Sequence, residues 1–165
     1  MRLQGYFSLT RCFSLGDGQD EPLTATYSHL NHTMAKASAN YVSVICEKHF
    51  GSFFVDLYSR LRDPSAVRSV NSQAQLLKSY KLAMPNIRGF EKTAEAVSKT
   101  MMKDLIQSEL CILLWSTFEE YVIHGLSALE SNPLVFGPDH VATVSIDDVR
   151  RVLFKISRVF GKNMS

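Results

Sequence analysis

The hydrophobic pattern between residues 101 and 129 is the most informative one in the chain. Apolar side chains cover most of a helical circumference in this segment, and only a narrow polar stripe interrupts them. A surface helix has a single apolar face, whereas a helix that is buried in the middle of a bundle is apolar on nearly all sides. The segment therefore predicts a central helix in an all-helical body, with neighbours on most sides.

A helical periodicity of apolar residues also begins near Phe90 and continues into this central segment. Because about 40 residues is long for a helix of a globular protein, we expect a break between Thr100 and Asp104. Further amphipathic helices are indicated where apolar residues recur at spacings of three and four. These helices are predicted over residues 32–61, 64–82 and 145–161. Gly51 is expected to weaken or bend the first of them near its middle.

Local signals mark the ends of the predicted helices. Thr33 is placed to cap the first helix, and Asp63 followed by Pro64 suits the start of the second. Ser145 and Asp148 resemble a capping box ahead of the last helix. Together with the break expected after residue 100, these signals indicate four to five helices.

The first 31 residues have a different pattern. Residues 5–15 alternate roughly between apolar and polar positions, residues 16–18 are a turn signal, and residues 23–30 resemble a second extended run. This segment is either a β-hairpin or an irregular arm that docks on the bundle or on a partner. We therefore expect an all-α protein: a single-domain helical bundle over residues 32–165, preceded by a short extended or hairpin arm over residues 1–31.

Composition excludes several classes of protein. The chain has 165 residues, of which 45% are hydrophobic and 21% charged, so it can bury the core of one globular domain. The net charge of +2 does not by itself indicate a nucleic-acid binder. No run of 18 apolar residues and no signal peptide is recognisable, so no membrane partner is expected. Cys12, Cys46 and Cys111 suit neither a disulfide framework nor a structural zinc site, which favours the cytoplasm and no cofactor.

The polar stripe of the central segment contains the candidate catalytic residues. The stripe consists of Glu109, Ser116, Glu120 and Ser127. Glu120 and His124 are four residues apart, so their side chains can touch on one face of a helix. A carboxylate that orients an imidazole and raises its pKa suits acid–base chemistry near neutral pH. The alternative is structural, with a stripe that faces water or a pair that forms a satisfied buried hydrogen bond.

The last helix contains the candidate nucleic-acid interface, a row of cations that could meet phosphates. The row follows a 4-3-4 spacing along one face and consists of Arg151, Lys155, Arg158 and Lys162. The alternative is a solvated face whose cations complement the negative end of the helix dipole.

Other motifs give little indication of chemistry. His29 and His32 could supply two metal ligands, but no third ligand has a suitable spacing, so no metal site is expected. The chain contains no glycine-rich phosphate loop, GxSxG elbow, HExxH motif or paired CxxC motif.

The segment SELCILLWSTFEEYVIHGLSAL, residues 108–129, resembles one helix of the HEPN superfamily, in particular of its small prokaryotic all-helical branch. The resemblance rests on an aromatic-Glu-x-aromatic element that begins at Phe118 and ends at Tyr121. It implies an all-helical fold, dimerisation and metal-independent ribonuclease activity, often in toxin or defence systems. The catalytic motif of that family is an Arg followed four to six residues later by a His, and no Arg here has a His at that spacing. The resemblance therefore implies an inactive, divergent or shortened member, and it supplies no catalytic residue.

Two leading functional hypotheses follow from these patterns, and a third is a viral or host-adaptor component whose N-terminal arm, residues 1–31, exchanges between subunits. The first is a non-enzymatic interaction protein that self-associates, as a dimer or a larger assembly, through an exposed apolar helix face and can also contact another protein. The second is a HEPN-like RNA-directed protein, either a metal-independent ribonuclease or an RNA-binding relative. In that case Glu120 and His124 would shape the site, and the basic face of the last helix would meet phosphate. The absence of a motif with reactive spacing favours the first.

Overall fold

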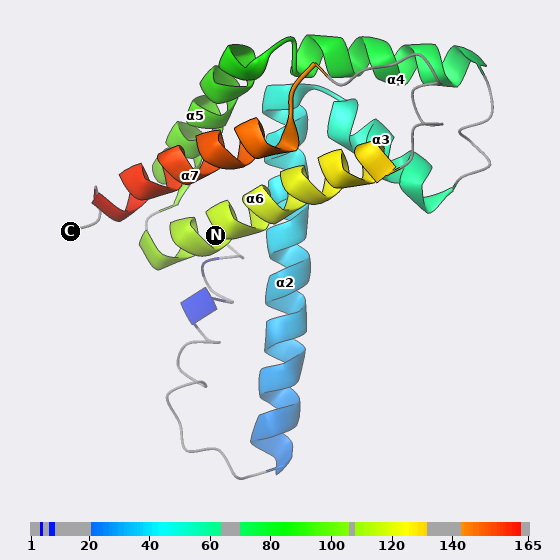
Figure 1. Ribbon diagram of the computed structural model, residues 1–165. Coiled ribbons are helices and arrows are strands. Elements are labelled where there is room, and N and C mark those ends of the chain that lie inside the picture. The colour runs from blue at the N-terminus through cyan, green and yellow to red at the C-terminus, as the bar shows by residue number, and fades with distance from the viewer. Residues whose placement is uncertain are drawn as a thin grey trace.

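The fold is all-α, as seen in a computed structural model of the chain (Figure 1). The structure describes residues 21–63, 70–105, 108–131 and 143–162, together with Gln4, Phe7 and Ser8. Within these residues there are six helices and no strands, which confirms the predicted fold class. The helices are α2 (Glu21–Phe50), α3 (Phe53–Arg62), α4 (Val70–Ala83), α5 (Ile87–Asp104), α6 (Ser108–Ser131) and α7 (Ile146–Lys162).

Helix α6 is the central helix that the apolar pattern predicted. It packs against α2, α3, α5 and α7, and Figure 1 shows it running beside α7 and across α2. Its polar stripe faces outward, because Glu109, Ser116 and Glu120 are all exposed. The helix is therefore buried on most of its surface and open to water along one line. Its fully or almost fully buried side chains include Leu110, Leu114, Trp115, Phe118 and Val122.

Aromatic rings fill the junction of α2, α3, α5 and α6. The ring centroid of Phe50 lies 5.5 Å from that of Phe54, 5.8 Å from that of Phe90 and 6.2 Å from that of Phe118. None of these four side chains is more than 3% exposed. Buried aromatic pairs at such distances contribute about 0.5–1.5 kcal/mol beyond the burial of their area. The end of α2 is thus anchored to three other helices at one point.

Gly51 separates α2 from α3. Its φ of +64° lies in the left-handed region, which glycine adopts without the steric penalty of a Cβ atom. Helix α2 ends at Phe50 and α3 begins at Phe53, so the bend that we expected at Gly51 is a complete break. This break accounts for the helix beyond the four to five predicted.

The long helical pattern that starts near Phe90 is also broken, as predicted. Helix α5 ends at Asp104, and α6 begins at Ser108. Between them Leu105 has an extended backbone, with φ −116° and ψ 123°, and a buried side chain. Burial of Leu105 therefore fixes the chain where the direction of the helix changes.

The start of α2 differs from the prediction. Residues 23–30 are helical, so the second extended run of the proposed hairpin is wrong. Thr33 is not a cap but lies inside the helix, where its hydroxyl donates to the carbonyl oxygen of His29 at 2.8 Å. Pro22 lies in the first turn, where its missing N–H costs nothing. Of residues 5–18, which hold the other run and the turn, only Phe7 and Ser8 are described. Both are helical, so the first extended run is wrong at these two positions, and Phe7 packs against the core.

Helix α7 begins at Ile146, directly after Ser145, as the predicted cap requires. The hydroxyl of Ser145 accepts a hydrogen bond from the backbone N–H of Asp147 at 3.2 Å, whereas a capping box would use the N–H of Asp148. Residues 64–69, which hold the predicted start of the second helix, lie outside the described residues, and Asp63 is the C-cap of α3.

Helix α2 extends far beyond the rest of the bundle. In Figure 1 the other helices surround only its C-terminal part, and its N-terminal part projects away from them. Its buried side chains begin at Ser38 and otherwise are Val42, Ile45, Cys46 and Phe50. A helix of 30 residues is about 45 Å long, so only about half of this length is embedded in the bundle. None of the described helices is long and apolar enough to span a bilayer.

Candidate functional site

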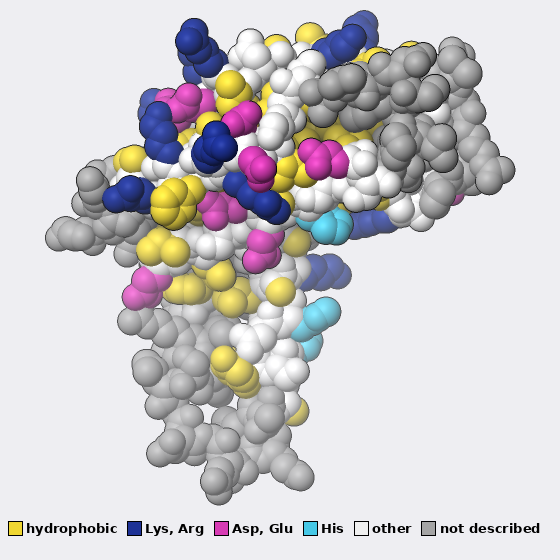
Figure 2. All heavy atoms as spheres, viewed as in Figure 1, with side chains coloured by type: hydrophobic (Ala, Val, Ile, Leu, Met, Phe, Trp, Pro, Cys, Tyr) yellow, Lys and Arg dark blue, Asp and Glu magenta, His cyan; other side chains and the backbone are white. Residues whose placement is uncertain are grey.

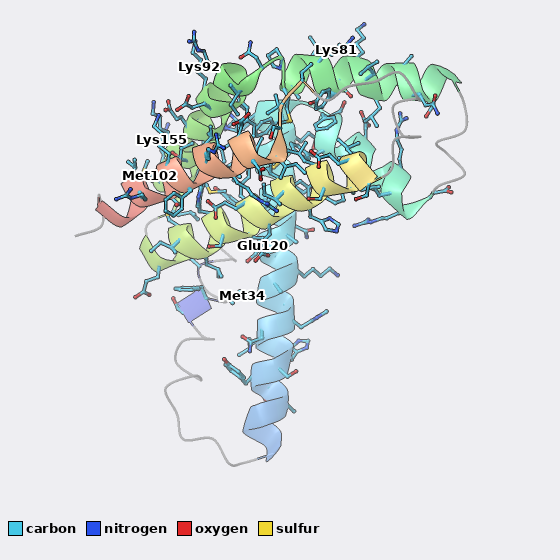
Figure 3. All side chains as sticks on the ribbon, viewed as in Figure 1. Met34, Lys81, Lys92, Met102, Glu120 and Lys155 are labelled. Atoms are coloured by element: carbon cyan, nitrogen blue, oxygen red, sulfur yellow. The ribbon has the colours of Figure 1, made fainter. Side chains whose placement is uncertain are left out.

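Glu120 and His124 lie at exposed positions of α6, and Figure 3 shows Glu120 on that helix. No hydrogen bond joins these two side chains, both of which the structure describes. His124 instead contacts Tyr58 of α3: the two rings are stacked, with centroids 5.9 Å apart and planes 2° apart. The hydroxyl of Tyr58 lies 3.3 Å from Nδ1 of His124. The spacing in sequence therefore suggested one partner for His124, and the fold supplies another.

The hydroxyl of Tyr58 favours one tautomer of His124. Tyr58 donates its single hydroxyl proton to the carbonyl oxygen of Tyr121, at 2.6 Å. Because that proton is already used, a hydrogen bond between these two side chains requires Nδ1–H of His124 as the donor to the Tyr58 oxygen. The neutral imidazole then has its lone pair on Nε2, which is the arrangement that a general base requires.

Tyr58 itself remains neutral under ordinary conditions. Burial is the main cause that raises its pKa, the neighbouring Tyr121 and Cys46 raise it further, and a hydrogen bond with the backbone of Gly125 lowers it. The rings of Tyr58 and Tyr121 have centroids 4.5 Å apart. Tyr58 therefore contacts His124 as a neutral phenol.

Carboxylates partly neutralise the basic face of α7. Lys155 Nζ lies 2.5 Å from Glu91 Oε1 of α5, and the hydrogen bond to Glu91 raises the pKa of Lys155. Arg151 Nη1 lies 3.2 Å from Asp148 Oδ1 on the same helix. The other two cations predicted for this face are Arg158, whose guanidinium lies 6.0 Å from the ring centroid of Phe154, and Lys162, the last residue of α7. The ion pairs of Lys155 with Glu91 and of Arg151 with Asp148 lower the positive potential that phosphates would meet at this face.

A groove of about 330 Å³ lies between α5 and α7. Figure 3 shows Met102 of α5 and Lys155 of α7 at this position. The groove has an apolar floor, but its rim carries charges of both signs, so its chemistry indicates no single class of ligand. Its lining residues are Glu95, Ser98, Lys99, Met102, Lys155, Ile156 and Val159.

His29 and His32 are both exposed on α2. In the part of the chain that the structure describes, no group of three or more His, Cys, Asp or Glu side chains is arranged to hold a metal ion.

A further candidate site is an apolar stripe on α2 that our sequence interpretation missed. Its residues recur at spacings of 3-4-3-4-3, which is the repeat of the two core positions of a coiled coil. We call them the α2 seam: Tyr27, Leu30, Met34, Ala37, Tyr41 and Val44. The first five are half-buried, and Val44 is 66% exposed. The signal was present in the sequence, but it was hidden because we expected the helix to begin at residue 32.

The α2 seam lies in a stretch with few charges, because residues 25–40 contain Lys36 but no Arg, Asp or Glu. Figure 3 shows Met34 on the portion of α2 that extends beyond the bundle. On the face shown in Figure 2, acidic and basic side chains gather over the bundle and are sparse on this projection. The charged surface and the apolar stripe are therefore separate features of the molecule.

Two buried hydroxyl groups mark the boundary between the projecting and the embedded parts of α2. Ser38 Oγ and Tyr41 Oη are inaccessible to water and have no hydrogen-bond partner among the described residues. Burial raises the pKa of Tyr41 to about 12, with smaller contributions from the charges of Asp104 and Cys111. A buried polar group without a partner costs about 1–3 kcal/mol.

Comparisons with models of known protein families, with curated proteins and with solved structures find no match to this chain. A functional assignment therefore depends on the chemistry and geometry of its own residues.

Proposed function

We propose that the protein is a non-enzymatic interaction module and that its activity is self-association. The observation that supports this proposal is the α2 seam, a coiled-coil repeat that runs from the projecting half of α2 onto the start of its embedded half. Isolated helices of about 15 residues are only marginally stable in water. Packing of the seam against a second helix would supply the stabilisation that the described helices do not give to this half.

The positions that flank the α2 seam favour a protein partner. Asn31, Thr33, Ser38 and Asn40 border the seam, and all four are uncharged. A helix that binds nucleic acid or lies on a membrane surface usually carries several Lys or Arg residues beside its apolar stripe. In residues 25–40 the only Lys or Arg is Lys36. An uncharged apolar stripe is best complemented by another of the same kind, which a second copy of the chain provides.

We also propose the cytoplasm as the compartment in which this association takes place. Cys46 and Cys111 are buried free thiols. Reduced cysteines of this kind are usual in a reducing compartment.

Sedimentation equilibrium over a wide range of protein concentration tests the proposal. We expect a reversible equilibrium between monomer and dimer, or a larger assembly. The double variant Leu30→Glu/Met34→Glu should remain monomeric, because it places two carboxylates on the α2 seam. The matched control is Ala35→Glu/Ala39→Glu, which adds the same charges at the same spacing on exposed positions of the same helix. A wild-type protein that stays monomeric at the highest concentration would contradict the proposal.

RNA-directed activity is the second candidate, and the geometry of His124 favours it. The neutral imidazole has its lone pair on Nε2, the side chain is exposed, and Tyr58 holds the ring in position. Incubation of the purified protein with mixed RNA tests this candidate. We would expect cleavage that His124→Ala abolishes and Glu120→Gln weakens. A protein that neither cleaves RNA nor binds it in a salt-sensitive manner at low ionic strength has no such activity.

A further inference from the structure

Resting on the proposed function, we infer that two copies of the chain pair through their α2 seams in antiparallel orientation. In this arrangement Met34 of one chain faces Ala37 of the partner subunit. Three observations carry this inference: the sizes of the seam residues, the position of the bundle at one end of α2, and the lack of charge beside the seam.

The sizes of the seam residues suit an antiparallel pair. In an antiparallel coiled coil the two kinds of core position face each other, so large and small side chains share each layer. The layers are then Tyr27 with Val44, Leu30 with Tyr41, and Met34 with Ala37. Each layer joins a larger side chain to a smaller one, and cores in which large and small residues alternate across an interface fill space well.

A parallel pair would place each seam residue against its own copy. Tyr27 and Tyr41 would then each face a second tyrosine, and Ala37 would face only another alanine. Two layers would be crowded while a layer between them was left with a void, and both defects are destabilising. The antiparallel arrangement distributes the same volume evenly along the seam.

The position of the bundle also favours the antiparallel arrangement. The other helices surround only the C-terminal end of α2 (Figure 1). A parallel pair would bring two bundles to the same end of the coiled coil, whereas an antiparallel pair places them at opposite ends. From Tyr27 to Val44 the seam is about 26 Å long. Val44 is 66% exposed although it lies on the embedded half, so the N-terminal part of a partner helix can reach it.

Charge does not oppose this orientation. In coiled coils the residues that flank the core often form ion pairs that select a parallel or an antiparallel partner. Asn31, Thr33, Ser38 and Asn40 form no such pairs because they are uncharged. The orientation is therefore set by side-chain size and by the helix dipoles. The dipoles of two antiparallel helices attract each other weakly. The pairing is therefore expected to be largely insensitive to salt.

Disulfide trapping tests the orientation. Tyr27→Cys protein and Val44→Cys protein, each with Cys12→Ser, are mixed and oxidised, with one of the two carrying a mass tag. In the antiparallel pair the cysteines at 27 and 44 face each other, whereas two cysteines at 27, or two at 44, lie about 26 Å apart. We expect the mixed disulfide to be the main product. Ala35→Cys mixed with Ala39→Cys is the control and should give no disulfide, because these exposed positions lie off the seam.

The alternative outcomes separate this inference from the proposed function. Disulfides between two copies of Tyr27→Cys, and between two copies of Val44→Cys, would overturn the antiparallel orientation and leave self-association standing. A dimer in sedimentation that gives no disulfide with either variant would overturn the α2 seam as the interface. A monomer in sedimentation would overturn the proposed function itself.

Discussion

The embedded and projecting halves of α2 belong to one continuous helix but differ in what stabilises them. From Ser38 to Phe50 the helix places five side chains in the interior of the bundle. From residue 25 to residue 37, every side chain is described and none is buried. Helical backbone therefore continues well beyond the point at which the described helices bury its side chains completely. Because most helical stability in proteins comes from packing of an apolar face, the projecting half depends on whatever covers the α2 seam.

The two halves also differ in the width of their apolar surface. The embedded half presents Val42, Ile45, Cys46 and Phe50, which spread over a broad arc and meet several helices at once. The projecting half presents a narrow line of residues with coiled-coil spacing. A broad arc suits the interior of a bundle, whereas a narrow line suits one partner helix. The width of the stripe thus indicates how many neighbours each half of the helix is built to contact.

Phe50→Ala is expected to have the largest effect on stability. It removes the ring that contacts Phe54, Phe90 and Phe118, and truncation of a buried Phe costs about 3–5 kcal/mol. Chemical denaturation followed by circular dichroism measures the change in the free energy of unfolding, which should be the same at every protein concentration. Val44→Ala is the control on the same half, and it should cost little in dilute solution because Val44 is exposed. A loss below about 1 kcal/mol for Phe50→Ala would contradict the role given to this ring.

Leu30→Ala should change stability only where the protein is dimeric. A partner that binds the folded state stabilises it by about 2.7 kcal/mol at a concentration a hundredfold above the dissociation constant. We expect the variant to lose about 2–3 kcal/mol of apparent stability under such conditions and very little at high dilution. Thermal unfolding at several concentrations checks this, because the wild-type midpoint should rise with concentration and the variant midpoint should not. An equal loss at all concentrations would mean that Leu30 is stabilised within a single chain.

Much of the embedded region could be predicted from the sequence. The residues of α6 are apolar on most sides because the helix has neighbours on most sides. The pattern of apolar residues therefore predicts directly which side chains are buried. The breaks at Gly51 and after Asp104 are also local, since one depends on the backbone freedom of glycine and the other ends an overlong helical pattern. The start of α2 was missed because the Thr and Tyr residues between positions 23 and 30 also suit a strand.

The contacts of the candidate site could not be predicted in the same way. The spacing of Glu120 and His124 on one helix was correct, but the partner of His124 is Tyr58, which is 66 residues away in the sequence. Likewise, the carboxylate beside Lys155 comes from Glu91 on another helix. Helical periodicity shows which residues share a face, whereas the side chains that a second helix brings to that face depend on tertiary packing.

Gly51→Ala tests the junction between α2 and α3. A Cβ atom at this position would meet no other atom within 4 Å, so the expected cost comes only from the backbone, whose φ is +64°. A non-glycine residue in the left-handed region loses about 1–2 kcal/mol. Gly51→Asn is the matched control and should lose less, because asparagine tolerates this conformation. Equal stability of the alanine variant and the wild type would show that the junction relaxes to another backbone conformation.

Tyr41→Phe is expected to have the smallest effect, and in the opposite direction. It removes a buried hydroxyl that has no partner among the described residues, so the free energy of unfolding should rise by up to about 1 kcal/mol. Tyr58→Phe is the matched control, because it removes a hydroxyl that donates to the Tyr121 carbonyl at 2.6 Å and should cost about 1 kcal/mol. Denaturation at pH 8 compares the two variants. A loss of stability in Tyr41→Phe would indicate that its hydroxyl has a partner in solution.

The pH dependence of the same variant sharpens the test. Burial raises the pKa of Tyr41 to about 12 in the folded chain, whereas an exposed tyrosine has a pKa of 10.0. Above pH 10 the unfolded chain therefore releases a proton that the folded chain retains. Ionisation of Tyr41 therefore leaves the stability of the wild type unchanged below pH 10 and lowers it as the pH rises from 10 towards about 12. Phenylalanine has no such proton, so the advantage of Tyr41→Phe over the wild type should widen between pH 8 and pH 11. A constant difference would show that the Tyr41 hydroxyl is accessible to water in the folded protein.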